Sequence, residues 1–189
     1  MEFGEIRAIE GDTIVSPSSP RARIRITSNM IYLGDLQYLL HQKNRVQEFF
    51  FIDVNGIGHV TRMLLVHFEG FLEGKEGAYD YPVNKIVHLN GQEFLYDTLF
   101  INIQQYIAEH PETAIARAAD YIRQRAYTLA GEVVFQRFLR LVDAEKRNEL
   151  IIAYMESSEK AGVTAKDIET DEAAANALLE RALASFKIL

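Results

Sequence analysis

Apolar residues are densest between Glu48 and Leu72, where two apolar runs flank the polar stretch at Asn55 and Gly56. Asparagine and glycine both tolerate the positive φ that a two-residue type I′ turn requires, and the flanking runs are rich in β-branched and aromatic residues. The pattern predicts a long β-hairpin over 48–72. Gly58 either extends the loop or forms a bulge, so the pairing register stays open.

Side chains of the second arm divide between two faces at a period of two. One face is mostly aliphatic and is the expected core side: Val60, Arg62, Leu64, Val66 and Phe68. The other face is more polar: His59, Thr61, Met63, Leu65, His67 and Glu69. Because Phe49, Phe50 and Phe51 cannot all point the same way in a strand, we expect other elements to cover both faces.

Shorter strands are expected on either side of this hairpin. Arginine alternating with aliphatic residues predicts a strand over 21–26 with one solvated face. We also expect a short strand over 3–9, and two short strands within 30–40 separated by a turn at Gly34. A further strand over 79–89 would be kept at a sheet edge by Pro82.

Helical periodicity begins after Asn90 and Gly91. Asn90 and Glu93 have the spacing of a capping box, and five apolar residues then share one helical stripe: Tyr96, Leu99, Phe100, Ile103 and Ile107. Pro111 suits the first turn of a second helix, whose inner residues would be Ile115, Ala118, Ala119, Ile122 and Ala126. The pattern therefore predicts an αα pair over 92–127.

Residues 133–156 fit either helices or strands, since their apolar spacing suits a helix while their β-branched and aromatic residues favour strands. We interpret them as a second hairpin with its loop over 143–148. Thr164 and Asp167 have the spacing to cap a short helical turn, and the acidic residues from Asp171 predict a last helix over 171–186.

These elements predict an α+β fold in which an antiparallel sheet, built around the 48–72 hairpin, packs against the αα pair and the C-terminal helix. A chain of 189 residues is long enough to bury a core as one domain, 1–189. Pro17 and Pro20 indicate that 1–20 is a loosely attached strand and loop.

Charge and composition exclude several functional classes. A formal net charge of −7 would repel a phosphate backbone, so nucleic acid is not an expected partner. The chain has no cysteine, which removes disulfides, thiolate nucleophiles and cysteine zinc sites. The acidic start and the lack of a long apolar run predict a cytoplasmic protein without a membrane partner. With no phosphate-binding loop, nucleophile elbow or EF-hand motif, we predict no cofactor.

His67 and Glu69 form the sharpest candidate for chemistry. Two residues apart on one strand, they would point the same way at a spacing of roughly 7 Å. An imidazole and a carboxylate so placed can bind a divalent ion or transfer protons. His88, from the following strand, is the third ligand in this metal hypothesis. His59 would lie about 25 Å along the strand from His67, too far to share a metal ion with it.

Arg62 is the best single polar anchor for a small-molecule site. A guanidinium on a core face must pair with an acid such as Glu48 or Asp53, reach the rim of the sheet, or meet an anionic ligand. Aromatic residues near the hairpin could line an apolar pocket with tyrosine hydroxyls at its mouth, although clusters of this kind more often form ordinary core. The predicted ligand-binding residues are Arg62, His67, Glu69, Tyr79 and Tyr81.

Two functions follow as hypotheses. The first is a non-enzymatic module that binds an apolar or anionic small molecule or a protein partner, because the chain has ample aromatic surface and no recognisable catalytic set. The second is a metal-assisted or His/Glu acid–base enzyme centred on His67 and Glu69. A homodimer formed through an exposed strand edge is a third hypothesis.

Overall fold

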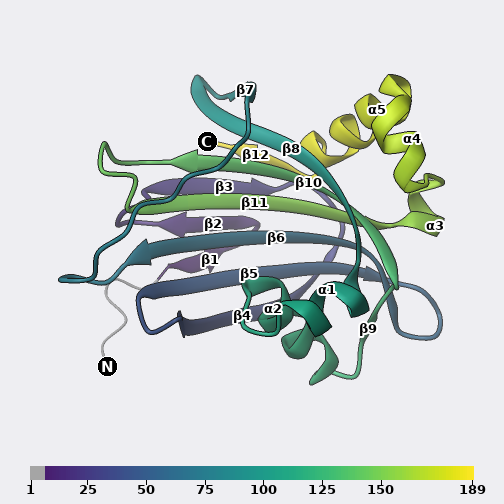
Figure 1. Cartoon of the computed structure of the whole chain (residues 1–189), viewed down its shortest axis with the longest axis horizontal. Coiled ribbons are helices and arrows are strands. Elements are labelled where there is room, and N and C mark those ends of the chain that lie inside the picture. Colours follow the sequence, from purple (N-terminus) through teal and green to yellow (C-terminus); the bar gives the residue numbers. More distant parts are fainter. Residues whose placement is uncertain (1–6) are drawn as a thin grey trace.

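The computed structural model describes residues 7–189 and contains two antiparallel sheets and two groups of helices (Figure 1). The larger, eight-stranded sheet has the order β4 (Ile31–Leu40), β5 (Asn44–Val54), β6 (His59–Phe71), β11 (Asn148–Ser157), β10 (Glu132–Leu141), β8 (Gln92–Asn102) and β7 (Lys85–Leu89), with β9 (Thr128–Leu129) paired parallel to β6. The four-stranded sheet has the order β1 (Ala8–Glu10), β2 (Thr13–Ser16), β3 (Ala22–Ile26) and β12 (Phe186–Ile188). The predicted α+β class with an antiparallel sheet is confirmed.

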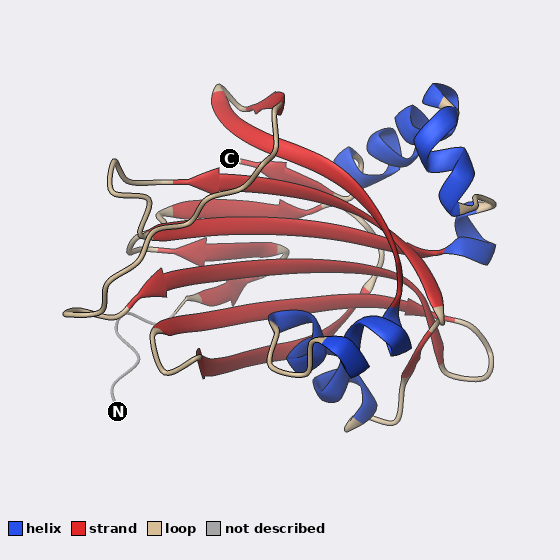
Figure 2. Ribbon diagram, viewed as in Figure 1, coloured by secondary structure: helices blue, strands red, loops and turns tan. Residues whose placement is uncertain are grey.

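The helices lie in two separate groups (Figure 2). The first group covers one face of the large sheet and consists of α1 (Ile103–Glu109) and α2 (Ala114–Arg123). The second group follows β11 and consists of α3 (Ser158–Ala161), α4 (Ala165–Thr170) and α5 (Glu172–Leu183). Among the described residues, no helix combines the length and the apolar character that crossing a membrane requires.

The predicted 48–72 hairpin is confirmed as β5 and β6, which lie side by side in the large sheet. Its loop includes Gly58, which was one of the two expected alternatives. Gly58 adopts a positive φ of 80° and extends the loop, while the Asn55 side-chain oxygen accepts hydrogen bonds from the backbone N–H groups of Ile57 and His59. The loop therefore spans four residues, and a bulge between the pairs Asp53–Arg62 and Val54–Val60 shifts the register along the rest of the hairpin.

Both faces of the large sheet are buried, as the three consecutive phenylalanines predicted. Phe49, Leu64 and Val66 face the small sheet and α5 and share a core with Ile24 and Leu178. The opposite face, which we call the helix-covered face, packs against α1 and α2 through Phe50, Ile52, Met63, Ala153 and Met155. Burial of apolar side chains on both faces explains why the sequence of these strands lacks a simple polar alternation.

The helix predicted from residue 92 is wrong over its first half, where the chain forms β8. Asn90 and Gly91 both have positive φ, 49° and 73°, and close a two-residue hairpin between β7 and β8 instead of capping a helix. Along β8, Phe94 faces the small sheet while Leu99 and Ile101 face the helices. The helical part begins later, where the Asn102 side chain caps α1.

The second predicted helix is confirmed as α2, with its start at Thr113 instead of Pro111. The Thr113 side chain accepts a hydrogen bond from the Ala116 backbone N–H, and Ala118, Ala119 and Ile122 are buried as predicted. Ala126, expected on the same stripe, lies beyond the helix with a positive φ of 64°.

Residues 31–40 form the single strand β4, so the two short strands predicted there are wrong. Gly34 marks a bulge in this strand, not a turn, and its φ is 127°. A Cβ atom at Gly34 would lie 2.4 Å from the hydroxyl of Tyr121, which stacks on Phe50. The glycine therefore lets α2 approach the edge of the sheet closely.

The remaining elements agree with the prediction in most cases. Residues 132–157 form the hairpin β10–β11, the final helix is α5, and Thr164 with Asp167 makes a capping box at α4. Strand β3 buries Ile24 and Ile26 and exposes its arginines. Of the strand predicted over 79–89, only Lys85–Leu89 is a strand. The strand predicted over 3–9 falls partly outside the described residues, and β1 starts at Ala8.

Candidate functional site

A pocket of about 250 Å³ lies on the helix-covered face, between the large sheet, the helices α1 and α2, and the loop 72–84. One part of its lining is apolar and consists of Leu65, Leu99, Ile101, Ala114, Ile115, Phe135, Ile151 and Ala153. The other part is polar and consists of Glu48, His67, Glu69, Tyr81, Tyr106, Thr113, Arg137 and Glu149. A hollow of about 340 Å³ between α1, α2 and β9 is larger, but none of its lining residues is a buried charged group.

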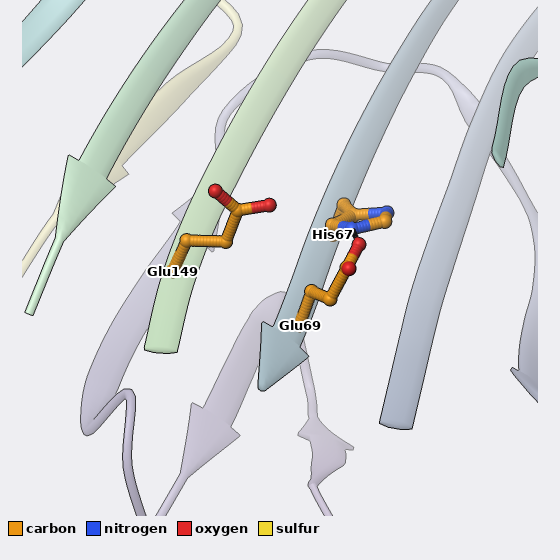
Figure 3. A group of neighbouring side chains, drawn as sticks. All are labelled: His67, Glu69 and Glu149. Atoms are coloured by element: carbon orange, nitrogen blue, oxygen red, sulfur yellow. Dashed lines mark hydrogen bonds and ion pairs between the residues drawn. The ribbon is translucent and has the colours of Figure 1, made fainter. Parts of the chain in front are cut away.

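Four of the polar residues form what we call the His–Glu cluster: Glu48, His67, Glu69 and Glu149. Their exposed fractions are 0%, 4%, 6% and 1%, so all four are shielded from bulk water. Adjacent strands bring them together, because β5 pairs Glu48 with His67 and β11 pairs Glu149 with Glu69. Figure 3 shows His67, Glu69 and Glu149 projecting from β6 and β11 on the same side of the sheet.

His67 lies between two carboxylates. Its Nδ1 is 2.9 Å from Glu48 Oε1, and its Nε2 is 2.9 Å from Glu69 Oε2. Burial alone would lower the pKa of His67, but the hydrogen bonds and charges of the two glutamates outweigh that effect and raise it above its usual value. A raised pKa favours the protonated ring, in which both nitrogens donate to the two glutamates.

Glu69 is held by neighbours on both of its oxygens. Oε2 meets His67, while Oε1 accepts hydrogen bonds from the Asn44 side-chain amide and from the Tyr79 hydroxyl, the latter at 3.0 Å. Burial would raise the pKa of Glu69, but these hydrogen bonds and the His67 charge lower it below its usual value. Glu69 is therefore a fixed, ionised carboxylate.

The buried carboxylate of Glu149 receives fewer hydrogen bonds than that of Glu69. Among the described residues, one side chain donates a hydrogen bond to it: the Tyr81 hydroxyl, 2.7 Å from Oε2. Burial raises the pKa of Glu149 to about 7, and the Glu69 charge adds to the shift. Two carboxylates directly opposite each other on adjacent strands destabilise the sheet unless a proton or a cation lies between them.

Two further buried polar atoms near the cluster are unsatisfied. Within residues 7–189, neither Glu48 Oε2 nor the Tyr38 hydroxyl has a hydrogen-bond partner. Burial, followed by the charges of Glu48 and Glu69, raises the pKa of Tyr38 above its usual range, which keeps the phenol neutral. A buried carboxylate oxygen without a donor is unusual, since most buried polar groups are paired.

The loop 72–84 closes the polar end of the pocket. Arg147 holds it, because this guanidinium donates hydrogen bonds to the carbonyls of Leu72, Lys75 and Gly77 at 3.3, 2.7 and 3.2 Å. The Tyr79 backbone N–H also donates to the Lys146 carbonyl at 2.8 Å. These contacts place the Tyr79 and Tyr81 hydroxyls over the two carboxylates that they bind.

The structure brings together four of the predicted ligand-binding residues: His67, Glu69, Tyr79 and Tyr81. The fifth, Arg62, must be corrected, because it lies on the face opposite to His67 and donates two hydrogen bonds to Asp53. Its pairing with an acid was one of the expected outcomes. It does not line the pocket.

The predicted third metal ligand, His88, must also be corrected. It lies on β7, and β8, β10 and β11 separate that strand from β6. His59 is exposed at the far end of β6, as its spacing from His67 required. Sequence reasoning missed Glu48 and Glu149, whose positions depend on strand register, and Glu149 takes the place assigned to His88.

The arrangement offers ionised or ionisable oxygen acceptors and one imidazole to whatever enters the polar end of the pocket. Arg137, the other charged residue of the lining, is already paired with Asp97 through two hydrogen bonds. The excess of carboxylates favours a species that carries positive charge or hydrogen-bond donors. No family model, curated protein or solved structure matches the chain.

Proposed function

We propose that the protein is a binding module whose pocket takes a compact, partly apolar ligand with a positively charged group directed at the His–Glu cluster. The observation that carries the proposal is the charge imbalance of that cluster, in which three buried glutamates and one histidine lie at the polar end of a pocket whose other end is apolar. A ligand ammonium group would supply the missing charge and the missing donors.

Size and wall chemistry support a small ligand. A volume of about 250 Å³ is below the range of roughly 300–1,000 Å³ that is common for pockets that bind drug-sized molecules. Leu99, Ile101 and Phe135 offer an apolar wall of the size of one aromatic ring or a short alkyl chain. The anionic ligand expected from Arg62 suits the pocket poorly, because Arg62 lies on the other face and the polar end is acidic.

An acid–base enzyme that uses His67 is less well supported than a binding module. Both ring nitrogens of His67 are engaged by buried carboxylates, so neither is free to exchange a proton with a ligand in the pocket.

Thermal shift measurements in the presence of a chelator test the proposal. We expect benzylammonium to raise the Tm, while benzyl alcohol and benzoate, which have the same ring, raise it little. Ala114→Trp should abolish the shift, because Ala114 is a half-buried residue that lines the pocket away from the His–Glu cluster.

Ala165→Trp is the matched control. Ala165 follows the N-cap Thr164 of α4 as Ala114 follows the N-cap Thr113 of α2, but it is exposed and remote from the pocket lining. This variant should keep the benzylammonium shift. Equal shifts in both variants, stabilisation by benzoate instead of benzylammonium, or no stabilisation by any of the three compounds would contradict the proposal.

A further inference from the structure

We propose that His67, Glu69 and Glu149 form a binding site for a divalent transition-metal ion such as Zn²⁺. The site goes beyond the proposed function: it occupies the polar end of the same pocket, so the ion and a ligand ammonium group would compete for the same carboxylates. One ligand atom from each residue lies within 4.8 Å of the other two. The three residues are 4%, 6% and 1% exposed, so the ion would be held inside the protein, not on its surface.

The local strand geometry positions all three groups for one ion. His67 and Glu69 are two residues apart on β6, which places them on the same face, and Glu149 is the direct partner of Glu69 across the β6–β11 ladder. Zinc bound to nitrogen and oxygen at about 2.0–2.2 Å in a tetrahedron separates its ligand atoms by about 3.3–3.6 Å. The His67 Nε2 and Glu69 Oε2 atoms, 2.9 Å apart, need to separate only slightly as the ion replaces the hydrogen between them.

Each proposed ligand is oriented by a second hydrogen bond. His67 Nδ1 meets Glu48 Oε1, an arrangement that fixes the ring with Nε2 directed at the other two carboxylates. Asn44 and Tyr79 hold Glu69, and Tyr81 holds Glu149. Such outer carboxylate, amide and hydroxyl partners are typical of metal-binding histidines and glutamates.

An independent observation also indicates a missing cation. Glu48 is fully buried and lines the pocket, and its Oε2 accepts no hydrogen bond among the described residues; the neighbouring Tyr38 hydroxyl could donate to it but, being neutral, would not balance its charge. Together with Glu149, which has a single donor, Glu48 leaves more negative charge in the cluster than the His67 ring can balance. A divalent ion would compensate that charge where a water molecule would not.

The ligand set indicates which ion fits. An imidazole with two carboxylates suits Zn²⁺ and other first-row transition ions, whereas Mg²⁺ and Ca²⁺ prefer oxygen ligands alone. Three protein ligands leave a fourth position for water or for a ligand atom. Since all three ligands line the pocket, that position faces the space in which the proposed small molecule would lie.

Calorimetric titration of untagged, chelator-treated protein with Zn²⁺ tests the site, with Mg²⁺ as the comparison ion. We expect one Zn²⁺ per chain and no comparable binding of Mg²⁺. Glu149→Gln keeps the size of the side chain and an oxygen that can accept from Tyr81, and should lower Zn²⁺ affinity by at least about 100-fold. Glu48→Gln, which weakens the hydrogen bond that orients His67 and removes one of the uncompensated charges, should lower it by about 10–100-fold.

The control variant removes His59 and His88, two of the four exposed histidines that the structure places away from the cluster, as H59Q and H88Q. It should bind Zn²⁺ as the unmodified protein does. X-ray absorption of the zinc-loaded protein should show one imidazole in a nitrogen and oxygen shell at about 2.0–2.1 Å. Absence of stoichiometric binding, full affinity in Glu149→Gln, or loss of binding in the control variant would overturn the metal site.

The two proposals can fail separately. Benzylammonium binding in the presence of chelator that Ala114→Trp abolishes, together with no Zn²⁺ binding, would retain the small-molecule pocket and reject the metal site. Zn²⁺ binding that depends on Glu149, together with no response to the three organic compounds, would retain the metal site and reject the organic ligand.

Discussion

Arg147 is the residue on which the closed state of the loop 72–84 most depends, and Arg147→Met should release that loop without unfolding the sheet. Methionine keeps an apolar stem of similar length to pack beside the Phe71 ring, which lies 5.2 Å from the guanidinium carbon. It removes the donors to the carbonyls of Leu72, Lys75 and Gly77.

The expected change in the free energy of opening the loop follows from the three hydrogen bonds that Arg147→Met removes. A hydrogen bond to a charged group contributes roughly 1.5–3 kcal/mol when it is fully buried, but Arg147 is only half-buried, so we take about 0.7 kcal/mol for each bond. The loss is then about 2 kcal/mol in the free energy of opening the loop, which raises its open population about 30-fold.

Hydrogen exchange measures this opening directly. The Tyr79 backbone N–H, bonded to the Lys146 carbonyl in the closed loop, should exchange about 30-fold faster in Arg147→Met, while amides in α5 keep their rates. Arg140→Met is the matched control, because Arg140 lies on the same hairpin and makes no side-chain hydrogen bond among the described residues. Unchanged exchange at Tyr79, or an equal increase in α5, would refute the role assigned to Arg147.

Three further variants test the core on the other face and the close approach of α2, each by urea unfolding. Arg181→Met should lower the free energy of unfolding by about 3 kcal/mol, because it leaves the buried Glu156 carboxylate with only the Tyr154 hydroxyl. Arg181 lowers the pKa of Glu156 in the folded protein below its usual value of 4.5. The ion pair therefore stabilises the fold above pH 4.5, and this stabilisation is lost as the pH falls through the lowered pKa. If Arg181→Met lowered the free energy of unfolding equally at pH 7 and pH 3, the pairing would be contradicted. Leu178→Ala should cost about 3 kcal/mol from the cavity that it leaves, and a loss below about 1 kcal/mol would mean that α5 is not part of this core. Gly34→Ala should lower the free energy of unfolding by about 2 kcal/mol, because alanine is strained at this positive φ and its Cβ would clash with the Tyr121 hydroxyl. The double variant with Tyr121→Phe should lose less stability than the two single variants combined, and simple additivity would argue against the clash.

The first central hairpin was predicted because its local signals agree, whereas 133–156 also fitted helices and was interpreted as a hairpin on its β-branched and aromatic residues. In 48–72 and in 132–157, apolar runs rich in β-branched and aromatic residues flank a polar loop. The prediction for the residues of β8 was wrong because a strand and a helix fit their sequence equally well. Its apolar residues are buried on both faces, so they also match a helical stripe, and an asparagine before glycine can start a helix or close a hairpin.

The candidate site was predicted only as far as spacing within one strand allows. The separation of His67 and Glu69 by two residues was enough to place them together. A two-residue turn at Asn55 and Gly56 would have paired Glu48 with Met63, but the four-residue loop and the bulge at its base together shift the register and pair Glu48 with His67. Glu149 comes from a strand about 80 residues later, and the pairing of β6 with β11 depends on the order of strands in the whole sheet.

Buried carboxylates on the two faces of the large sheet differ in how completely they are paired. That difference is the strongest reason to assign a function to the His–Glu cluster. Behind the sheet, Glu156 is 1% exposed and is met by two hydrogen bonds from Arg181 and one from Tyr154. On the helix-covered face, three glutamates share one histidine, and one carboxylate oxygen has no donor among the described residues.

Apolar replacements of similar size at Glu48 and Glu149 would relieve the strain of uncompensated charge and would suit the surrounding apolar side chains. A chain that pairs a buried acid fully on one face, yet leaves Glu48 and Glu149 partly unpaired around a pocket on the other, carries a cost that folding alone does not require. In the proposed metal site a bound cation would remove that cost, because it would supply to Glu69 and Glu149 the positive charge that Arg181 supplies to Glu156.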